Sequence, residues 1–133
     1  MVTITSGTVL GNLRSGGDLA GNSGSITGTD VNVTAGNVTF GNDLPFVLIA
    51  GPCQMESRDH ALFMAQKLVD MARRLGMGLI YKSSFDKANR SSIKSYRGPG
   101  LKDGLAMLAE VKRQLNVPIA TDIHEIDQAA PVA

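Results

Sequence analysis

Residues 46–82 read FVLIAGPCQMESRDHALFMAQKLVDMARRLGMGLIYK, and this stretch decides the fold class. It begins with a continuous apolar run, Phe46–Ala50, which is typical of a strand buried on both faces. Apolar side chains then recur at helical spacing from Arg58 to Leu75. Ser57 is the predicted N-cap of this helix and Gly76 its end. The stretch therefore predicts a strand followed by an amphipathic helix.

The same alternation continues toward the C-terminus. Leu79–Tyr81 is a predicted second strand, and a polar, glycine-containing loop follows over Ser83–Gly100. A second amphipathic helix is expected over Leu101–Leu115, and a third strand over Pro118–Thr121. Strand, helix, strand, helix, strand with these lengths predicts parallel strands joined by right-handed crossovers. The fold class is therefore α/β.

Polar motifs follow each predicted strand. They are Gly51–Cys53, Lys82–Ser84 and Asp122–Glu125. Parallel strands place their C-terminal ends on one rim, and (β/α)8 barrels keep their active sites on that rim. This placement favours a functional role for the three motifs.

The N-terminal part has a different composition, which changes near Asn42. Residues 1–42 hold nine of the fifteen glycines and three charged side chains, so this part of the chain is poorly suited to form a hydrophobic core. Val31–Phe40 predicts a hairpin that turns at Ala35–Asn37. For residues 1–30 three interpretations compete: a disordered tail, a glycine-rich β extension, or sequence upstream of the true start. Residues 31–133 would form the ordered part.

Composition excludes some classes of function. The chain has 133 residues and a net charge of +1, with no basic stripe or aromatic-interleaved basic patch, so nucleic-acid binding is not expected. No apolar run approaches the roughly 18 residues that span a bilayer, and no signal peptide is recognisable. A single cysteine cannot form an internal disulfide, which fits a reducing compartment. We expect a cytoplasmic protein.

Residues 82–92, KSSFDKANRSS, concentrate two lysines, an arginine and short polar side chains directly after an apolar strand. Arginine offers a planar fork of donors and lysine a point charge, so the segment suits a ligand that carries phosphate and carboxylate groups. A solvated surface loop is the alternative that charge density alone would favour.

The amino-acid sequences of four motifs favour the anion-binding segment over the solvated surface loop. KANRSS within residues 82–92 occurs together with IAGPCQMES (49–57), SYRGPGLKDG (95–104) and TDIHE (121–125). In this order they resemble the 3-deoxy-D-manno-octulosonate-8-phosphate synthase family, from about Gly36 to Ala133. The aromatic-pathway 3-deoxy-heptulosonate-7-phosphate synthases and the sialic acid synthases are the nearest alternatives.

The resemblance implies a (β/α)8 barrel with a hairpin beneath it. Such a barrel needs roughly 250 residues, and this sequence ends just after the third predicted strand. We therefore expect the N-terminal hairpin and about the first three βα units, as a fragment of a longer product rather than a truncated gene. Exposed sheet edges and apolar faces predict aggregation or partial disorder of the isolated chain, and no activity on its own.

The implied activity is the condensation of phosphoenolpyruvate with D-arabinose 5-phosphate and water, in lipopolysaccharide biosynthesis, which implies a Gram-negative source. Two alternatives stay open. The chain as given could be an inactive truncated or fused product in which the glycine-rich N-terminus mediates an interaction. It could also belong to a related phosphoenolpyruvate-dependent synthase that uses another sugar phosphate.

The resemblance also assigns residues. Lys82 could form a Schiff base, bind an anion or cap strand carbonyls, and the family pattern favours contact of both Lys82 and Lys87 with phosphoenolpyruvate. Asp122 is the third catalytic candidate. The implied substrate-binding residues are Ser84, Asn89, Arg90 and Ser91, of which Arg90 and Ser91 would reach the sugar phosphate of a neighbouring subunit. That implies a homo-oligomer, a tetramer by resemblance.

Cys53 has two interpretations. A lone cysteine after a strand is most often a small core hydrophobe. In GPCQMES it stands where metal-dependent family members carry a ligand, which implies a divalent metal such as Zn²⁺, Fe²⁺ or Mn²⁺. Asp122, His124 and Glu125 could be metal ligands, acid–base groups or hydrogen-bonded structure at the rim.

Two further residues complete the set. His60 is expected at the surface. Arg97, with the glycines at 98 and 100, predicts an ordered loop that shapes the site.

Overall fold

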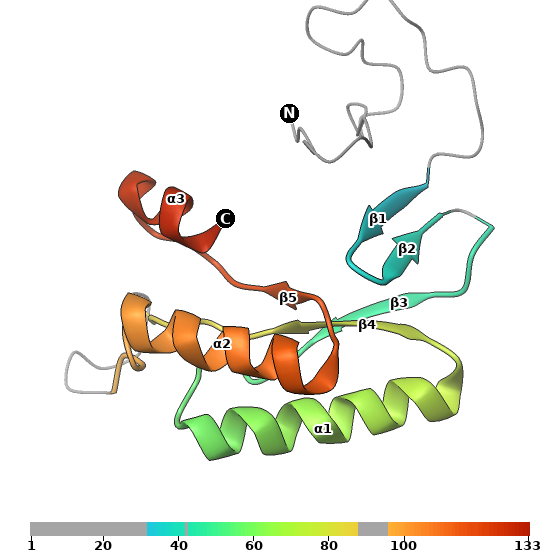
Figure 1. The fold of residues 1–133 in the computed structure, drawn as a ribbon, viewed down its shortest axis with the longest axis horizontal. Helices are drawn as coiled ribbons and strands as arrows, with labels where there is room; N and C mark the ends of the chain where they lie inside the picture. The colour runs from blue at the N-terminus through green and yellow to red at the C-terminus, as the bar shows by residue number, and fades with distance from the viewer. Residues whose placement is uncertain (1–31, 42, 88–95) are drawn as a thin grey trace, which may run out of the picture.

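A computed structural model describes residues 32–41, 43–87 and 96–133 of the chain. Figure 1 shows the elements of this part. In chain order they are β1 (Val33–Ala35), β2 (Val38–Phe40), β3 (Val47–Ala50), α1 (Arg58–Leu75), β4 (Gly78–Lys82), α2 (Leu101–Leu115), β5 (Ile119–Ala120), η1 (Ile126–Gln128) and α3 (Ala129–Val132).

The three later strands form one parallel sheet in the order β3-β4-β5, as the alternation of strands and helices predicts. Val47 lies opposite Gly78, and Tyr81 lies opposite Ile119. β5 is shorter than the predicted strand, although the carbonyl of Pro118 already accepts the Tyr81 N–H at 2.9 Å. The described part is thus a mixed α/β fold with an open sheet.

Both long helices have the predicted bounds. The Ser57 side chain accepts the backbone N–H of His60 at 3.2 Å, which satisfies one of the free donors at the start of α1. Gly76 ends the helix in the left-handed conformation, at φ 65°, which glycine adopts without steric penalty. The local capping signals therefore decide both ends of α1. No helix within the described ranges has the length and apolar character needed to cross a membrane.

The core lies between the sheet and helices α1 and α2, which occupy the same side of the sheet in Figure 1. Tyr81 and Phe85 are fully buried there, next to alanines of α1 such as Ala65. Burying two aromatic side chains contributes on the order of 2–3 kcal/mol each. This packing fixes the C-terminal end of β4, where the polar motif at 82–87 begins.

The expectation that the first strand is buried on both faces is wrong for the described part of the chain. Ile49 is 54% exposed and Phe46 is 70% exposed, whereas Leu48 and Ala50 pack against the core. The reason is that β3 is an edge strand and that the helices cover one face of the sheet. The central strand β4 does have three consecutive buried residues.

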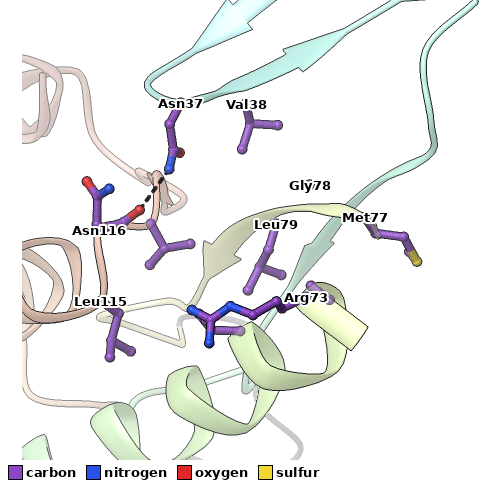
Figure 2. A pocket seen from close by; sticks show the side chains of 11 residues that line it. Asn37, Val38, Arg73, Met77, Gly78, Leu79, Leu115 and Asn116 are labelled. Atoms are coloured by element: carbon purple, nitrogen blue, oxygen red, sulfur yellow. Dashed lines mark hydrogen bonds between the residues drawn. The ribbon is translucent and has the colours of Figure 1, made fainter. Parts of the chain in front are cut away.

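The predicted hairpin is present as β1 and β2, with Gly36 and Asn37 in the turn. Its turn packs near the residues that precede β5: the Asn37 side chain donates to the Asn116 carbonyl at 3.0 Å. The hairpin, the ends of α1 and α2 and the start of β4 line an open pocket of about 410 Å³ (Figure 2). The hairpin thus lies at the N-terminal ends of the parallel strands, opposite the polar motifs.

Candidate active site

Three chain segments meet where the parallel strands end. Gly51 follows β3 so closely beside β4 that an added Cβ would lie 1.9 Å from the Lys82 carbonyl oxygen, so this position requires glycine. The Ser83 hydroxyl donates to the Pro52 carbonyl at 2.8 Å, and the Ser83 N–H reaches the Ala120 carbonyl at 3.3 Å. The residues after β3, β4 and β5 therefore form one continuous rim.

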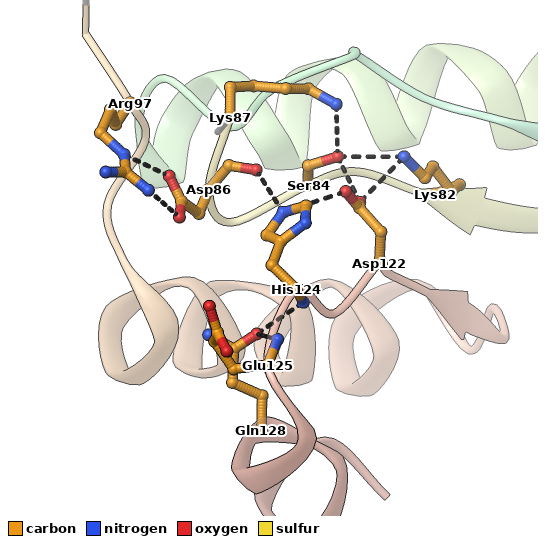
Figure 3. A network of polar contacts seen from close by, with 9 residues as sticks. All are labelled: Lys82, Ser84, Asp86, Lys87, Arg97, Asp122, His124, Glu125 and Gln128. Carbon is orange, nitrogen blue, oxygen red and sulfur yellow. Dashed lines mark hydrogen bonds and ion pairs between the residues drawn. The ribbon is translucent and has the colours of Figure 1, made fainter. Parts of the chain in front are cut away.

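Four of the predicted site residues come together on this rim (Figure 3). We call Lys82, Ser84, Lys87 and Asp122 the strand-end cluster. The Lys82 ammonium lies 3.1 Å from Asp122 Oδ1 and 3.0 Å from Ser84 Oγ, and the Lys87 ammonium lies 2.8 Å from the same hydroxyl. Ser84 is fully buried and its hydroxyl donates to Asp122 Oδ1. The cluster combines two ammonium groups with one carboxylate.

Asp122 is held in its ionised form by these contacts. Burial alone would raise the pKa of its carboxyl group, but hydrogen bonds from Ser84 and Lys82 outweigh burial and lower the pKa to about 2. The Asp122 side chain is therefore a permanent acceptor at neutral pH. Among the four side chains of the cluster, two ammonium groups face one carboxylate, and this excess of positive charge favours an anionic ligand.

A second layer surrounds the cluster. His124 Nε2 lies 3.0 Å from the Asp86 carbonyl oxygen and 3.4 Å from Asp122 Oδ2. The Asp86 carboxylate forms a bidentate pair with Arg97, at 2.8 Å from Nε and 2.6 Å from a terminal nitrogen. Such a fork fixes both distance and orientation. In addition, the Lys87 N–H donates to the Arg97 carbonyl at 2.7 Å.

This second layer confirms part of the sequence-based expectations. Arg97 and Gly98 do belong to an ordered segment beside the site: Gly98 has a φ of 112° and a Cβ there would lie 2.4 Å from the Phe85 carbonyl oxygen. Sequence reasoning missed Asp86 as the partner of Arg97. Opposite charges at the two ends of one loop are the signal that could have indicated the pair.

Glu125 has a structural role. Its side chain accepts the N–H of Gln128, and the Gln128 side chain accepts the N–H of Glu125 at 3.3 Å, which together cap η1. Of the interpretations open for this residue, hydrogen-bonded structure at the rim describes it.

Asn89, Arg90 and Ser91, the residues expected to bind the sugar phosphate, lie outside the described residues. His60 differs from the expectation of a surface residue: it is partly buried, and its Nδ1 atom is inaccessible and has no hydrogen-bond partner among the residues that the structure describes. The physical reason is that the first turn of α1 packs against the body of the chain through the neighbouring Ala61, which is buried.

Cys53 is exposed, so the interpretation as a core hydrophobe is wrong. It lies between Pro52 and Gln54, which both contact the β4 end, and it is thus on the same rim as the strand-end cluster. An accessible thiol can supply one soft ligand to a metal. Within the described ranges, however, no three His, Cys, Asp or Glu side chains lie close enough to hold a metal ion together.

The sequence also matches a protein family model. Residues 25–133 fit the model described as the DAHP synthetase I family. The chain belongs to the DAHP synthetase I family. The match begins earlier than Gly36, where the resemblance in the motifs starts.

Individual curated proteins also match the chain. A protein of Rickettsia bellii strain OSU 85-389, named 2-dehydro-3-deoxyphosphooctonate aldolase, is 60% identical over 97 residues, which cover 73% of this chain and 35% of that protein. A protein of Brucella ovis with the same name is 55% identical over 101 residues, covering 76% of this chain and 36% of that protein. The chain therefore spans about a third of the length of these relatives. The names agree with the resemblance found in the motifs.

Proposed function

We propose that this chain supplies the phosphoenolpyruvate-binding part of a synthase that makes 3-deoxy-D-manno-octulosonate 8-phosphate. The observation that carries the proposal is the strand-end cluster, in which Lys82 and Lys87 converge on one buried serine beside an ionised aspartate. Two ammonium groups against one carboxylate suit a small ligand with several negative charges. The names of the relatives at 55–60% identity supply the substrate class.

In the proposed reaction, C3 of phosphoenolpyruvate attacks the aldehyde carbon of arabinose 5-phosphate and forms a C–C bond. Water adds at C2, and the C–O bond to phosphate breaks, releasing inorganic phosphate. Lys82 and Lys87 hold the carboxylate and phosphate of phosphoenolpyruvate and offset the charge that develops on them. Asp122, which stays ionised, orients Lys82 and Ser84 and accepts a hydrogen bond from the second substrate or from water.

The contacts of Lys82 support anion binding over Schiff-base chemistry. An imine would remove the ammonium that pairs with Asp122 at 3.1 Å and with Ser84 at 3.0 Å. Borohydride should therefore trap no adduct on Lys82 in the presence of either substrate. A covalent adduct on Lys82, detected by peptide mass, would show an aldolase of the imine type instead.

The proposal extends to the parts of the relatives that lie outside the region matched by this chain. We propose a (β/α)8 barrel in which this chain contributes the first three strands, and a homo-oligomer in which Arg90 and Ser91 reach a neighbour's sugar phosphate. Cytoplasmic localisation and a role in lipopolysaccharide biosynthesis belong to the same proposal. Native mass spectrometry tests the oligomer, and a monomer at working concentration would contradict it.

A divalent metal is a further element of the proposal. Cys53 would be one ligand, and because no cluster of three candidate ligands occurs among the described residues, the others would come from elsewhere in the enzyme. When bound, such a metal would orient the aldehyde or the water. Equilibrium dialysis of the completed enzyme defined below against Zn²⁺ should show stoichiometric binding, which Cys53→Ala should abolish. Equal binding by the variant would exclude the cysteine as a ligand.

The decisive experiment uses the chain itself and a completed enzyme. The completed enzyme is this chain joined to the part of the Rickettsia bellii relative that follows its matched region. Phosphate release from phosphoenolpyruvate is measured with arabinose 5-phosphate and, separately, with erythrose 4-phosphate. We expect turnover of the completed enzyme with the five-carbon sugar phosphate and none from the isolated chain.

The outcomes separate the alternatives. Preference for erythrose 4-phosphate would move the protein to the heptulosonate branch of the family. A completed enzyme that folds and turns over neither sugar phosphate would refute the proposed function. For substitutions of the cluster lysines in the completed enzyme, Lys112→Ala serves as the control, because Lys112 is an exposed lysine on α2.

A further inference from the structure

His124 lies beside the strand-end cluster, between Asp122 and Asp86 (Figure 3). Its Nε2 atom is 3.0 Å from the backbone carbonyl oxygen of Asp86 and 3.4 Å from Asp122 Oδ2. Its backbone N–H donates to Gln128 Oε1 at 2.8 Å, and its ring packs against Phe85 with centroids 6.3 Å apart. The imidazole is therefore held from both its backbone and its ring.

The surroundings of Nε2 decide where its hydrogen lies. A backbone carbonyl and an ionised carboxylate are both acceptors, and a bare nitrogen between them would meet two negative partial charges. Nε2 therefore carries a hydrogen, in the neutral and in the charged ring alike. That hydrogen is donated to the Asp86 carbonyl oxygen at 3.0 Å, on the edge of the ring that lies 3.4 Å from Asp122 Oδ2, so it is not directed at a substrate.

The position of His124 also completes the setting of Asp122. Oδ1 of Asp122 takes the Ser84 hydroxyl and the Lys82 ammonium, whereas Oδ2 faces His124. Contacts on both oxygens prevent the carboxylate from rotating about its terminal bond. The Asp86 carbonyl holds His124 in turn, and the pair of Asp86 with Arg97 fixes that part of the backbone.

We propose that His124 is a positioning residue: its Nε2 edge, held by the Asp86 carbonyl, faces Asp122 Oδ2 and thereby keeps this carboxylate aligned on Lys82 and Ser84. The inference rests on the proposed function for its catalytic consequence. Its structural part, the protonated Nε2, is independent of that function. His124 acts through Asp122 and transfers no proton to or from the substrates.

The structural part is tested by nitrogen NMR of histidine-labelled protein, recorded on the chain itself and on the completed enzyme. The His124 signals are assigned by their loss in His124→Gln. We expect a hydrogen on Nε2 throughout the neutral pH range. A neutral ring with a bare Nε2 would overturn the inference, whether or not the protein proves to be a synthase.

The catalytic part is tested with two variants of the completed enzyme. His124→Leu keeps the volume and removes the donor, and should lower kcat by between about tenfold and about a hundredfold, because misplaced catalytic groups cost that much. The KM for phosphoenolpyruvate should change little, since the lysines remain. His124→Gln places an amide N–H near the former Nε2 and should restore most of the kcat. His60→Gln is the matched control, because it changes the other histidine of the chain, which lies on α1 and far from His124 in the sequence.

Each result has a distinct meaning. An inactive parent enzyme refutes the proposed function, and the NMR result then decides the inference by itself. An active parent with full activity in His124→Leu refutes the positioning role. An equal decrease of kcat in His124→Gln and His124→Leu refutes the role of the Nε2 donor. An increase in the KM for phosphoenolpyruvate with unchanged kcat would show that His124 acts on binding.

Discussion

Asp122 provides the sharpest quantitative prediction, because its ionised form is stabilised by the folded structure. In the folded chain its pKa is about 2, against an ordinary value of 3.8. A carboxyl group whose pKa is lower in the folded than in the unfolded state stabilises the fold above its unfolded pKa. This contribution is lost as the pH falls from about 4 to about 2.

The magnitude follows from the same two values. A lowering from 3.8 to about 2 corresponds to at most about 2–3 kcal/mol, at about 1.4 kcal/mol for each pH unit. The side chains of Asp122 and Lys82 are each 34% exposed, so solvent screening reduces the attraction between them. We therefore expect Asp122 to contribute about 1 kcal/mol to the free energy of unfolding at neutral pH.

Urea unfolding of the completed enzyme, followed by circular dichroism between pH 2 and pH 7, measures this contribution. Asp122→Asn should lose about 1 kcal/mol near pH 7, and the difference from the parent should shrink as the pH falls toward 2. Asp43→Asn, an exposed position on the loop before β3, serves as the control. A constant difference between parent and Asp122→Asn over the whole pH range would refute the reasoning. The reasoning would also be refuted if Asp122→Asn lost the same free energy of unfolding in a Lys82→Met background, since Lys82 helps to lower the pKa of Asp122.

Three further predictions concern other residues of the rim. Lys87→Ala in the completed enzyme should raise the KM for phosphoenolpyruvate about tenfold or more, since a charge-assisted hydrogen bond contributes about 1.5–3 kcal/mol. The same increase in Lys112→Ala would mean that the effect on KM is not specific to the strand-end cluster. Gly51→Ala should lower the free energy of unfolding by at least about 3 kcal/mol, because its Cβ would lie 1.9 Å from a carbonyl oxygen of β4; urea unfolding that matches the parent would show that the two segments are not in such close contact. Arg97→Ala removes the bidentate partner of Asp86 and should raise the KM for arabinose 5-phosphate at least about threefold, and kinetics identical to the parent would contradict a role for this pair in ordering the rim.

The sequence predicted the helices and their ends well, because those signals are local. Ser57 and Gly76 act within one turn of the helix that they cap, and the apolar spacing of α1 and α2 repeats over the helix itself. The parallel order of β3, β4 and β5 also followed, since strands joined by helices have few other arrangements. Lys82 and Asp122 could be placed on one rim for the same reason.

Contacts between distant segments could not be predicted in this way. Cys53 is exposed although an isolated cysteine after a strand is usually buried, and Ile49 is exposed although its strand is continuously apolar. In both cases the outcome depends on which neighbours cover a face, and composition does not specify neighbours. The pair of Asp86 with Arg97 depends likewise on how the two ends of one loop approach each other.

The sequence by itself determined the α/β class, the bounds of α1 and α2 and the set of polar residues that follow each strand, because spacing along the chain encodes these features. The tertiary structure alone decided which of those residues touch. Ser84 and Asp122 are 38 positions apart, and His124 meets the Asp86 carbonyl across the same separation. Both contacts exist because parallel pairing brings the ends of β4 and β5 side by side, and short-range hydrogen bonds then select the partners.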